Sequence, residues 1–316
     1  MNAPRTRVQR RPVHGVLLLD KPLGLSSNNA LQRCKWLLRA EKAGHTGTLD
    51  PLATGVLPLC FGAATKFSQL QLEADKTYEA VAALGVKTST GDAEGDMIQT
   101  RPVPEITPER LAAVARQFTG AIRQVPPMHS ALKKDGKALY EYARAGEEVE
   151  REARDVVVYE LTVAAAQTDR AQHAIQFMAK VSKGTYIRTL AEDMGEALGC
   201  GAHLLSLRRV ATGHFDVSQC LTLEALEAMS EEARQAALLP VDALLPGHTP
   251  VTLDADNAGR FLSGLRRRGA WPDNEFIAVY GTEPRALLGT AHAKAGELIP
   301  GRLLAPTEIQ QILETS

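Results

Sequence analysis

Apolar and polar positions follow two different periods along this chain, and together they predict a mixture of strands and helices. Residues 13–20 form a nearly continuous apolar run, which indicates a buried strand, and the turn-forming residues 21–24 close it. Ala30, Leu31, Cys34, Leu37 and Leu38 then recur at helical spacing. Ser26 or Ser27 can cap that helix, because serine favours the N-cap position.

The same two periods continue through the rest of the chain. Residues 78–84 and 175–181 predict strands, and Thr107 with Pro108 starts a helix whose inner face carries Leu111, Val114, Ala115 and Phe118. A further helix from about Thr189 ends at Gly199. Residues 44–62 contain too many glycines, threonines and prolines for one regular element.

Composition places the domain boundary and excludes one class of partner interaction. The 316 residues suggest about two domains, and 44% hydrophobic residues are enough for a large core. Beyond residue 248, short apolar runs punctuated by glycines are typical of a small β-barrel. The formal net charge of −1 excludes nucleic-acid binding by bulk positive charge, but it leaves local basic patches open. We therefore expect a flexible basic arm at 1–12 and domains at 13–247 and 248–316.

Other patterns bear on where the protein acts. No apolar run approaches the eighteen or so residues of a membrane span, and the apolar run after the N-terminal arginines is too short for a secretory signal. The four cysteines lie far apart without a C-x-x-C pair, so we expect neither a disulfide framework nor a structural zinc. The prediction is a cytoplasmic protein without a metal.

The most informative segment for chemistry is residues 44–58, with the sequence GHTGTLDPLATGVLP. They place one carboxylate, Asp50, in a rigid loop between glycines and a proline, where small neighbours allow a bulky substrate to approach. The loop is not a phosphate-binding P-loop, because no Gly-Lys-Ser/Thr follows. An isolated Asp-Pro pair would indicate only a turn capped by the aspartate.

The whole segment, however, resembles the active-site motif of the TruB family, the tRNA pseudouridine-55 synthases. Further family-like motifs follow in order at residues 15–27, 76–78, 91–95, 125–133, 139–144, 182–191 and 207–209. Several ordered motifs across residues 13–213 are far more specific than any one of them. One departure is His129, where family members often have a tyrosine, and we expect it to change only local packing.

The resemblance implies a mixed α+β protein with the pseudouridine synthase fold: a central, largely antiparallel sheet and a small C-terminal PUA-like RNA-binding barrel. It implies isomerisation of the T-loop uridine at position 55 of tRNA. This reaction changes no oxidation state and needs no group from outside, so no cofactor is expected. The uridine must leave its stack and enter an aromatic or apolar pocket.

The resemblance also assigns expected roles to single residues. Asp50 matches the catalytic aspartate, and attack on the sugar, attack on the base and removal of a sugar proton all stay open. The other matches are His45 near the displaced nucleotide, Tyr78 stacking on the base, Tyr186 and Leu207 lining the uracil pocket, and Arg188 pairing with the carboxylate. Asp92, Glu94 and Asp96 fail the calcium-loop spacing and indicate a polar turn.

Clusters of basic residues predict contacts with the RNA backbone. Charge runs are usually solvated, but in a tRNA enzyme phosphate contact is the better hypothesis. The candidates are Lys21, Lys66, Lys133, Arg208, Arg266, Arg267 and Arg268. Lys21 is first of all expected to pack against the active-site loop, and a solvated role is equally open for Lys66.

Two rival functions remain at this level. One is a non-catalytic tRNA-binding or RNA-chaperone protein on the same fold, which the presence of Asp50, Tyr78 and Arg188 argues against. The other is a small-molecule enzyme that uses Asp50 for acid–base chemistry, in which the basic clusters would have no role. The expected partner is the T-arm of tRNA, with no membrane and no obligate protein partner, and the expected state is a monomer.

Overall fold

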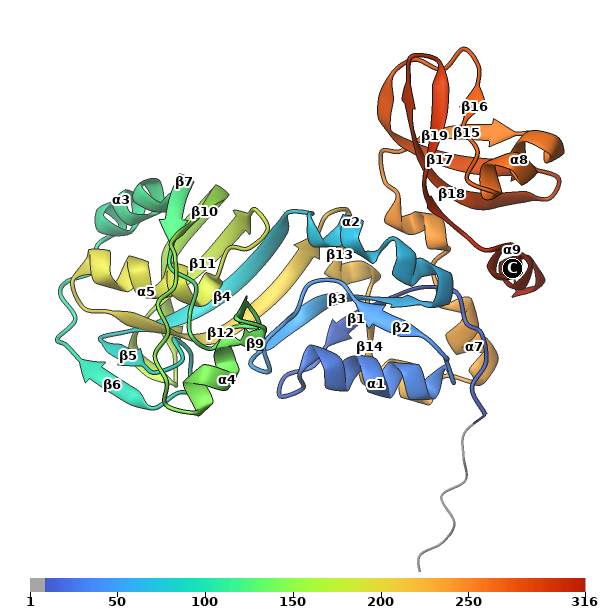
Figure 1. The fold of residues 1–316 in the computed structure, drawn as a ribbon. Helices are drawn as coiled ribbons and strands as arrows, with labels where there is room; N and C mark the ends of the chain where they lie inside the picture. The colour runs from blue at the N-terminus through green and yellow to red at the C-terminus, as the bar shows by residue number, and fades with distance from the viewer. Residues whose placement is uncertain (1–8, 316) are drawn as a thin grey trace, which may run out of the picture.

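The computed structural model describes residues 9–315, which form two main β-sheets with helices packed on them and two additional two-stranded sheets. The large sheet has the strand order β14-β1-β3-β12-β4-β11-β10-β7, with β2 and β13 attached to β3 and β12 (Figure 1). Its strands are β1 Gly15–Lys21, β2 Ala43–His45, β3 Ala53–Phe61, β4 Lys76–Leu84, β7 Gly120–Gln124, β10 Arg154–Thr168, β11 Ala171–Val181, β12 Ala202–Thr212, β13 Phe215–Asp216 and β14 Leu221–Thr222. Among these described strands only the β1–β14 and β3–β12 pairs are parallel, so the predicted largely antiparallel sheet is confirmed.

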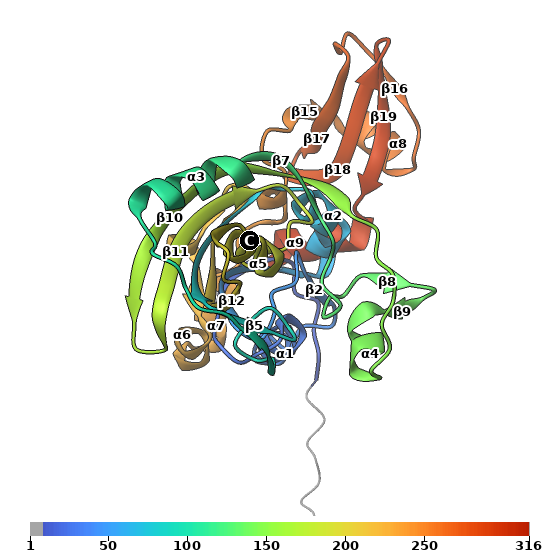
Figure 2. The ribbon, with the colours of Figure 1, turned by 90° about the vertical axis from the view of Figure 1, so that its left-hand side faces the viewer.

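Helices bury their apolar faces against one side of this sheet. Figure 2 shows the curved strands partly enclosing α5 (Ile187–Leu198), and α1 (Ser27–Leu37) and α3 (Pro108–Phe118) join the same core. The predicted helix ends are confirmed: the side chains of Ser26 and Thr107 accept the capping hydrogen bonds of α1 and α3, and Gly199 ends α5 with a left-handed φ of 90°.

Strand β3 is a central element that the sequence pattern did not predict. It runs through the segment whose glycines and prolines suggested irregular structure, yet it lies between β1 and β12 near the centre of the sheet. Gly55 is required there, because a Cβ atom at this position would lie 2.1 Å from the carbonyl oxygen of Arg209. Burial between two strands therefore outweighs the weak strand propensity of this segment.

The C-terminal unit is a curled half-barrel, which confirms the predicted small PUA-like barrel. Its five strands have the order β15-β17-β18-β19-β16 within the described residues. They are β15 Thr249–Leu253, β16 Arg267–Arg268, β17 Asn274–Thr282, β18 Arg285–Lys294 and β19 Glu297–Leu303, with helices α8 Ala255–Leu262 and α9 Pro306–Thr315 beside them. In Figure 1 this sheet stands apart from the large one.

Apolar and charged contacts join the C-terminal unit to the large sheet. Val16, Val56 and Phe67 share one buried cluster with Tyr280 and Leu304. Beside that cluster, the Lys66 ammonium lies 2.6 Å from the Glu308 carboxylate and also donates to the carbonyl of Leu303. Phosphate contact by Lys66 would have to displace this internal pairing.

The remaining elements are short: α2 Ser68–Leu72, β5 Val86–Thr88, β6 Met97–Thr100, β8 Lys133–Lys134, β9 Lys137–Ala138, α4 Leu139–Arg144, α6 Leu223–Ala228 and α7 Glu231–Ala236. Most of the predicted arm at 1–12 lies outside the described residues. Its last part is attached, since Arg10 donates to the Ala40 carbonyl and Arg11 pairs with Glu231 at 3.1 Å. None of the helices found in residues 9–315 has the length and apolar composition that a membrane span requires.

Candidate active site

A pocket of about 360 Å³ lies where the 46–52 loop, between β2 and β3, meets the start of α5. The loop contributes Asp50, and Tyr78 comes from β4 near its first residue. Five of the side chains predicted from the sequence line this one pocket: Asp50, Tyr78, Tyr186, Arg188 and Leu207. The fold therefore brings together residues that are far apart in the sequence.

Arg188 connects the loop to the rest of the site. Its Nη2 atom lies 2.9 Å from Oδ2 of Asp50, so the expected ion pair is present. The same guanidinium donates to the carbonyls of Thr90 (2.9 Å) and His129 (2.7 Å). Only 6% of the Arg188 side chain is exposed, against 41% of Asp50. The arginine is thus a fixed, buried partner, and the carboxylate remains accessible from the pocket.

Asp92 joins Asp50 and Arg188 as a third charged residue of the site, although its local sequence predicted only a polar turn. Its Oδ2 lies 3.7 Å from Nη1 of Arg188, and only 4% of its side chain is exposed. The turn interpretation is correct locally, because Thr90 Oγ1 and the Glu94 backbone N–H both donate to Asp92 Oδ1. The contact with Arg188 spans almost a hundred residues, so no local pattern could predict it.

Opposing effects act on the Asp50 carboxyl. Burial in the pocket raises its pKa, the Arg188 cation acts in the opposite direction, and the negative charge of Asp92 raises the pKa further. The balance leaves the pKa of Asp50 above its ordinary value. An ionised carboxylate that is incompletely neutralised is a stronger base and nucleophile than one held in an exclusive ion pair.

Flat and apolar side chains wall the pocket around this carboxylate. Tyr78 and Leu207 are both 9% exposed, and they come from the neighbouring strands β4 and β12. Tyr186 is held at the start of α5, where its backbone N–H donates to Oε1 of Gln124 at 3.0 Å. Burial raises the pKa of Tyr186, so its phenol stays protonated near neutral pH. Such walls suit a planar base.

Two cations complete the lining, Lys76 and Arg209. Both are buried, at 8% and 1% exposure. Burial and the charge of Arg209 lower the pKa of Lys76 to about 8. Both residues belong to the family-like motifs at residues 76–78 and 207–209. A positive environment of this kind favours an anionic ligand beside the pocket.

His45 ends β2 directly before the loop and does not line the pocket. Burial and the nearby charge of Arg209 lower the pKa of His45, so its imidazole is neutral near pH 7. The Nδ1 atom of His45 is buried without a hydrogen-bond partner among the described residues.

The structure corrects the predicted phosphate contact of Lys21. Its side chain is fully buried, with the ammonium donating to the carbonyls of Pro22 and Leu25, and burial lowers its pKa to about 8. A phosphate has no access to this group. By contrast, Lys133 is exposed on the β8–β9 hairpin, next to the pocket residues Ala131 and Leu132.

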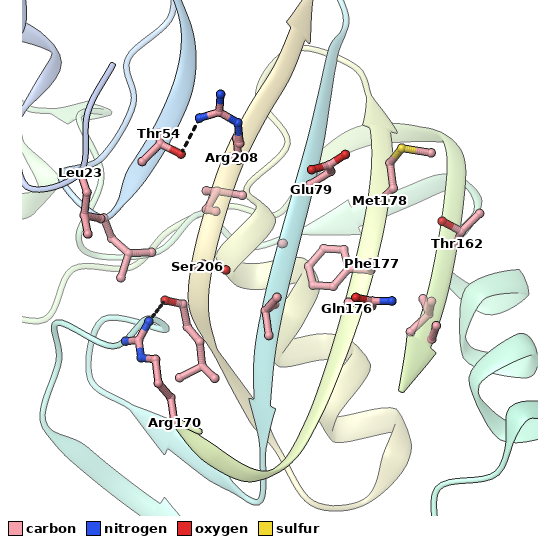
Figure 3. Close-up of a pocket in the computed structure, with 17 residues that line it drawn as sticks. Leu23, Thr54, Glu79, Thr162, Arg170, Gln176, Phe177, Met178, Ser206 and Arg208 are labelled. Atoms are coloured by element: carbon pink, nitrogen blue, oxygen red, sulfur yellow. Dashed lines mark hydrogen bonds between the residues drawn. The ribbon is translucent and has the colours of Figure 1, made fainter. Parts of the chain in front are cut away.

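Arg208, another predicted contact with the RNA backbone, lies on the opposite face of the sheet from the pocket. Consecutive strand residues point to opposite faces, so Leu207 lines the pocket and Arg208 does not. Figure 3 shows Arg208 with Glu79 and Met178 in a second, larger hollow of about 730 Å³. There both arms of its guanidinium reach the carboxylate of Asp20, at 3.0 and 2.6 Å. The charge of Arg208 is thus paired with Asp20, and its side chain does not line the Asp50 pocket.

The three consecutive arginines of the C-terminal unit are partly neutralised as well. Arg266 and Arg268 both contact Glu297, at 3.2 and 3.4 Å, because β16 pairs with β19. Arg267 donates to Oδ1 of Asn257. The acid that pairs with this run comes from the neighbouring strand β19.

Three models of pseudouridine synthase domains match consecutive segments between residues 35 and 304. Residues 35–187 match the TruB family pseudouridylate synthase N-terminal domain. Residues 188–246 match the tRNA pseudouridylate synthase B C-terminal domain, and residues 249–304 match the C-terminal region of pseudouridine synthase II TruB.

Two of the relatives that carry the name tRNA pseudouridine synthase B illustrate the match. The protein of Verminephrobacter eiseniae is 66% identical over 313 residues, covering 98% of this chain and 95% of that protein. The protein of Ralstonia nicotianae is 59% identical over 300 residues, covering 93% and 95%. Among solved structures, a chain of a Cbf5–Nop10–Gar1 complex superposes with a TM-score of 0.66 at 25% identity, covering 100% of this chain and 88% of that one.

Proposed function

Because this chain belongs to the TruB family of pseudouridylate synthases, we propose that it isomerises the T-loop uridine at position 55 of tRNA, with Asp50 as the catalytic carboxylate. The isomerisation of a tRNA uridine to pseudouridine is the activity of the family. The observation that carries the assignment of Asp50 is its ion pair with buried Arg188 at a pocket walled by Tyr78 and Tyr186.

The chemistry of the reaction fits a site with one carboxylate. The bond between the sugar C1′ and N1 of the uracil breaks, the base turns, and a bond from C1′ to C5 forms. The proton on C5 is lost and N1 gains a proton, so atoms and electrons balance without a cofactor. Asp50 can act as a nucleophile towards the sugar or the base, or as a base that removes a sugar proton.

The pocket walls would hold the uridine after it leaves the T-loop stack. Tyr78, Tyr186 and Leu207 offer a flat, mostly apolar slot, and a flipped base loses its stacking partners unless the protein replaces them. His45 would lie near the displaced nucleotide. Its neutral imidazole can accept or donate a hydrogen bond without a charge change.

The tRNA backbone would be held mainly outside the pocket. Lys133 on the exposed hairpin is the nearest candidate, and Arg266, Arg267 and Arg268 supply a second, more distant contact. We also propose that the protein acts as a monomer, without a protein partner, in the cytoplasm, where tRNA is modified. The proposal of a monomer is supported by the pocket, because one chain supplies all five of the predicted residues that line it.

The direct test is incubation of the purified protein with an unmodified tRNA transcript and no added cofactor. We expect pseudouridine at position 55, also in the presence of a metal chelator, and none in a transcript with cytidine at that position. Binding of the transcript without product would instead favour the non-catalytic tRNA-binding function. Product that disappears with the chelator would contradict the cofactor-free reaction.

A further inference from the structure

The backbone that carries Asp50 is attached to α1 through one serine hydroxyl. Oγ of Ser27, the first residue of α1, accepts a hydrogen bond from the Leu49 N–H at 2.7 Å and donates one to the Leu49 carbonyl at 3.0 Å. Ser27 is 1% exposed and Leu49 is 3% exposed. A single buried hydroxyl thus satisfies both backbone groups of the residue that precedes Asp50.

On the other side of the loop, Arg209 holds a second backbone group. Its Nη2 atom donates to the carbonyl of Gly47 at 3.0 Å, and its Nε donates to the carbonyl of Val56 in β3 at 2.7 Å. Arg209 is 1% exposed. Burial of a guanidinium is unfavourable unless its donors are satisfied, and here backbone carbonyls of the loop and of β3 satisfy two of them.

The backbone conformation of the loop favours a glycine where Arg209 approaches it. Gly47 has a φ of 74°, in the left-handed region, and a Cβ atom there would lie 3.3 Å from Nη1 of Arg209. Two further backbone hydrogen bonds complete the attachment, from Thr46 N–H to the Pro58 carbonyl and from Gly24 N–H to the Pro51 carbonyl.

We propose that Ser27 and Arg209 are positioning residues, which hold the 47–49 backbone so that the Asp50 carboxylate meets its substrate in a reactive geometry. This proposal rests on the proposed catalytic role of Asp50. Asp50 is 41% exposed and its side chain has one fixed partner, Arg188, so the backbone must supply the remaining precision. Displacement of a reacting group by about 1 Å can cost about 100-fold in rate.

The chain offers a matched control for each positioning residue. Ser26 is adjacent to Ser27, but its hydroxyl caps α1 by accepting from the Asn29 N–H, and within residues 9–315 it has no hydrogen bond to the 46–52 loop. Arg170 resembles Arg209 in donating to a backbone carbonyl, that of Leu205 at 2.7 Å, but it lies in the hollow on the other face of the sheet (Figure 3). Loss of a control residue removes a structural contact without loosening the 46–52 loop.

The experiment compares Ser27→Ala with Ser26→Ala, and Arg209→Lys with Arg170→Lys. For each folded variant, single-turnover pseudouridine formation at saturating enzyme, tRNA affinity, thermal stability and amide hydrogen exchange of residues 46–52 are measured. We expect the rate of Ser27→Ala and Arg209→Lys to fall about 10- to 100-fold, tRNA affinity to stay within about threefold, and exchange to rise in the loop. The controls should keep rates within about twofold, although Ser26→Ala loses a helix cap.

Outcomes that overturn the proposal are distinct from those that overturn the role of Asp50. A wild-type single-turnover rate in Ser27→Ala contradicts the proposal, and so does a rate that falls equally in Ser26→Ala in proportion to lost stability. Ser27→Ala decides the question alone if Arg209→Lys does not fold. Asp50→Asn is measured in parallel: if it is inactive while Ser27→Ala is fully active, only the positioning proposal fails, whereas an active Asp50→Asn removes its premise.

Discussion

Asp50 and Arg188 form an ion pair in which the cation is buried and the carboxylate is accessible. The distance from Arg188 Nη2 to Asp50 Oδ2 is 2.9 Å, and the side chains are 6% exposed for Arg188 and 41% exposed for Asp50. Arg188 sits in a frame of backbone carbonyls that fixes its guanidinium before any substrate arrives. Because folding already fixes the guanidinium, no free energy is needed to orient it during the chemical step.

The shape of the Arg188 side chain should therefore matter as well as its charge. Arg188→Lys keeps a positive charge but cannot reach Asp50 and the two carbonyls together. We expect single-turnover pseudouridine formation to fall by about 100-fold or more, in the range found when one preorganised donor is lost, and tRNA affinity to change little. An unimpaired rate in this variant would mean that only net charge is needed.

The pH dependence of the reaction should report the charges around Asp50. Asp92 raises the pKa of Asp50, so Asp92→Asn should lower that pKa. Because the ionised carboxylate is the active form, the rate falls as the pH drops through the pKa, and in Asp92→Asn this fall should occur at a lower pH. The measurement is the pH profile of the single-turnover rate for both proteins. A shift of the acid limb to higher pH would contradict the assigned electrostatics.

Tyr78 can be tested for two roles with two substitutions. If stacking is its whole role, Tyr78→Phe should react almost as fast as the wild type, since base stacking of about 1–3 kcal/mol does not need the hydroxyl. We expect instead that Tyr78→Phe binds tRNA normally and reacts slowly, because the phenol handles a proton. Tyr78→Leu should lose stacking as well. A near-normal single-turnover rate with Phe would exclude the proton role.

The three arginines of the C-terminal unit should contribute less to phosphate binding than their number suggests. Each free phosphate contact changes the slope of log affinity against log salt by about 0.7–0.9, so three would give about 2–2.7. Because Arg266 and Arg268 share Glu297, we expect alanine at all three positions to flatten the slope by less than this. The single-turnover rate at saturating enzyme should barely change.

Glu297→Gln is the matched variant for this salt titration. It releases both arginines, so tRNA binding should become stronger at low salt and the slope should become steeper. An unchanged slope in the triple variant would identify these arginines as a solvated surface. A collapsed saturating rate would mean that the C-terminal unit takes part in the chemistry.

The sequence predicted correctly those helix ends that depend on interactions between residues close together in the chain. The Ser26 cap, the Thr107 cap and the left-handed Gly199 follow from short-range hydrogen bonding and backbone sterics, and the structure has all three. Strand β3 was missed because its stability comes from its neighbours β1 and β12, whereas Gly55 and Pro58 argue against a strand when considered alone.

Only the site residues that belong to family-like motifs could be predicted from the sequence. The resemblance to a family brought Asp50, Tyr78 and Arg188 together on the basis of motif order, and the fold places them in one pocket. The contacts of Asp92 with Arg188 and of Glu297 with the arginine run join segments that are distant in sequence. The burial of Lys21 fits the packing role that was expected first for this residue, whereas the alternative, phosphate contact, has no access to it.

The most direct test of the account is single-turnover pseudouridine formation by Asp50→Asn, measured together with its affinity for tRNA. The substitution keeps the shape of the side chain and removes its charge. We expect that no pseudouridine forms while tRNA affinity changes by less than about tenfold, or ~1.4 kcal/mol. A variant that keeps even a tenth of the wild-type rate, or that is inactive only because it no longer binds tRNA, would contradict the catalytic role of Asp50.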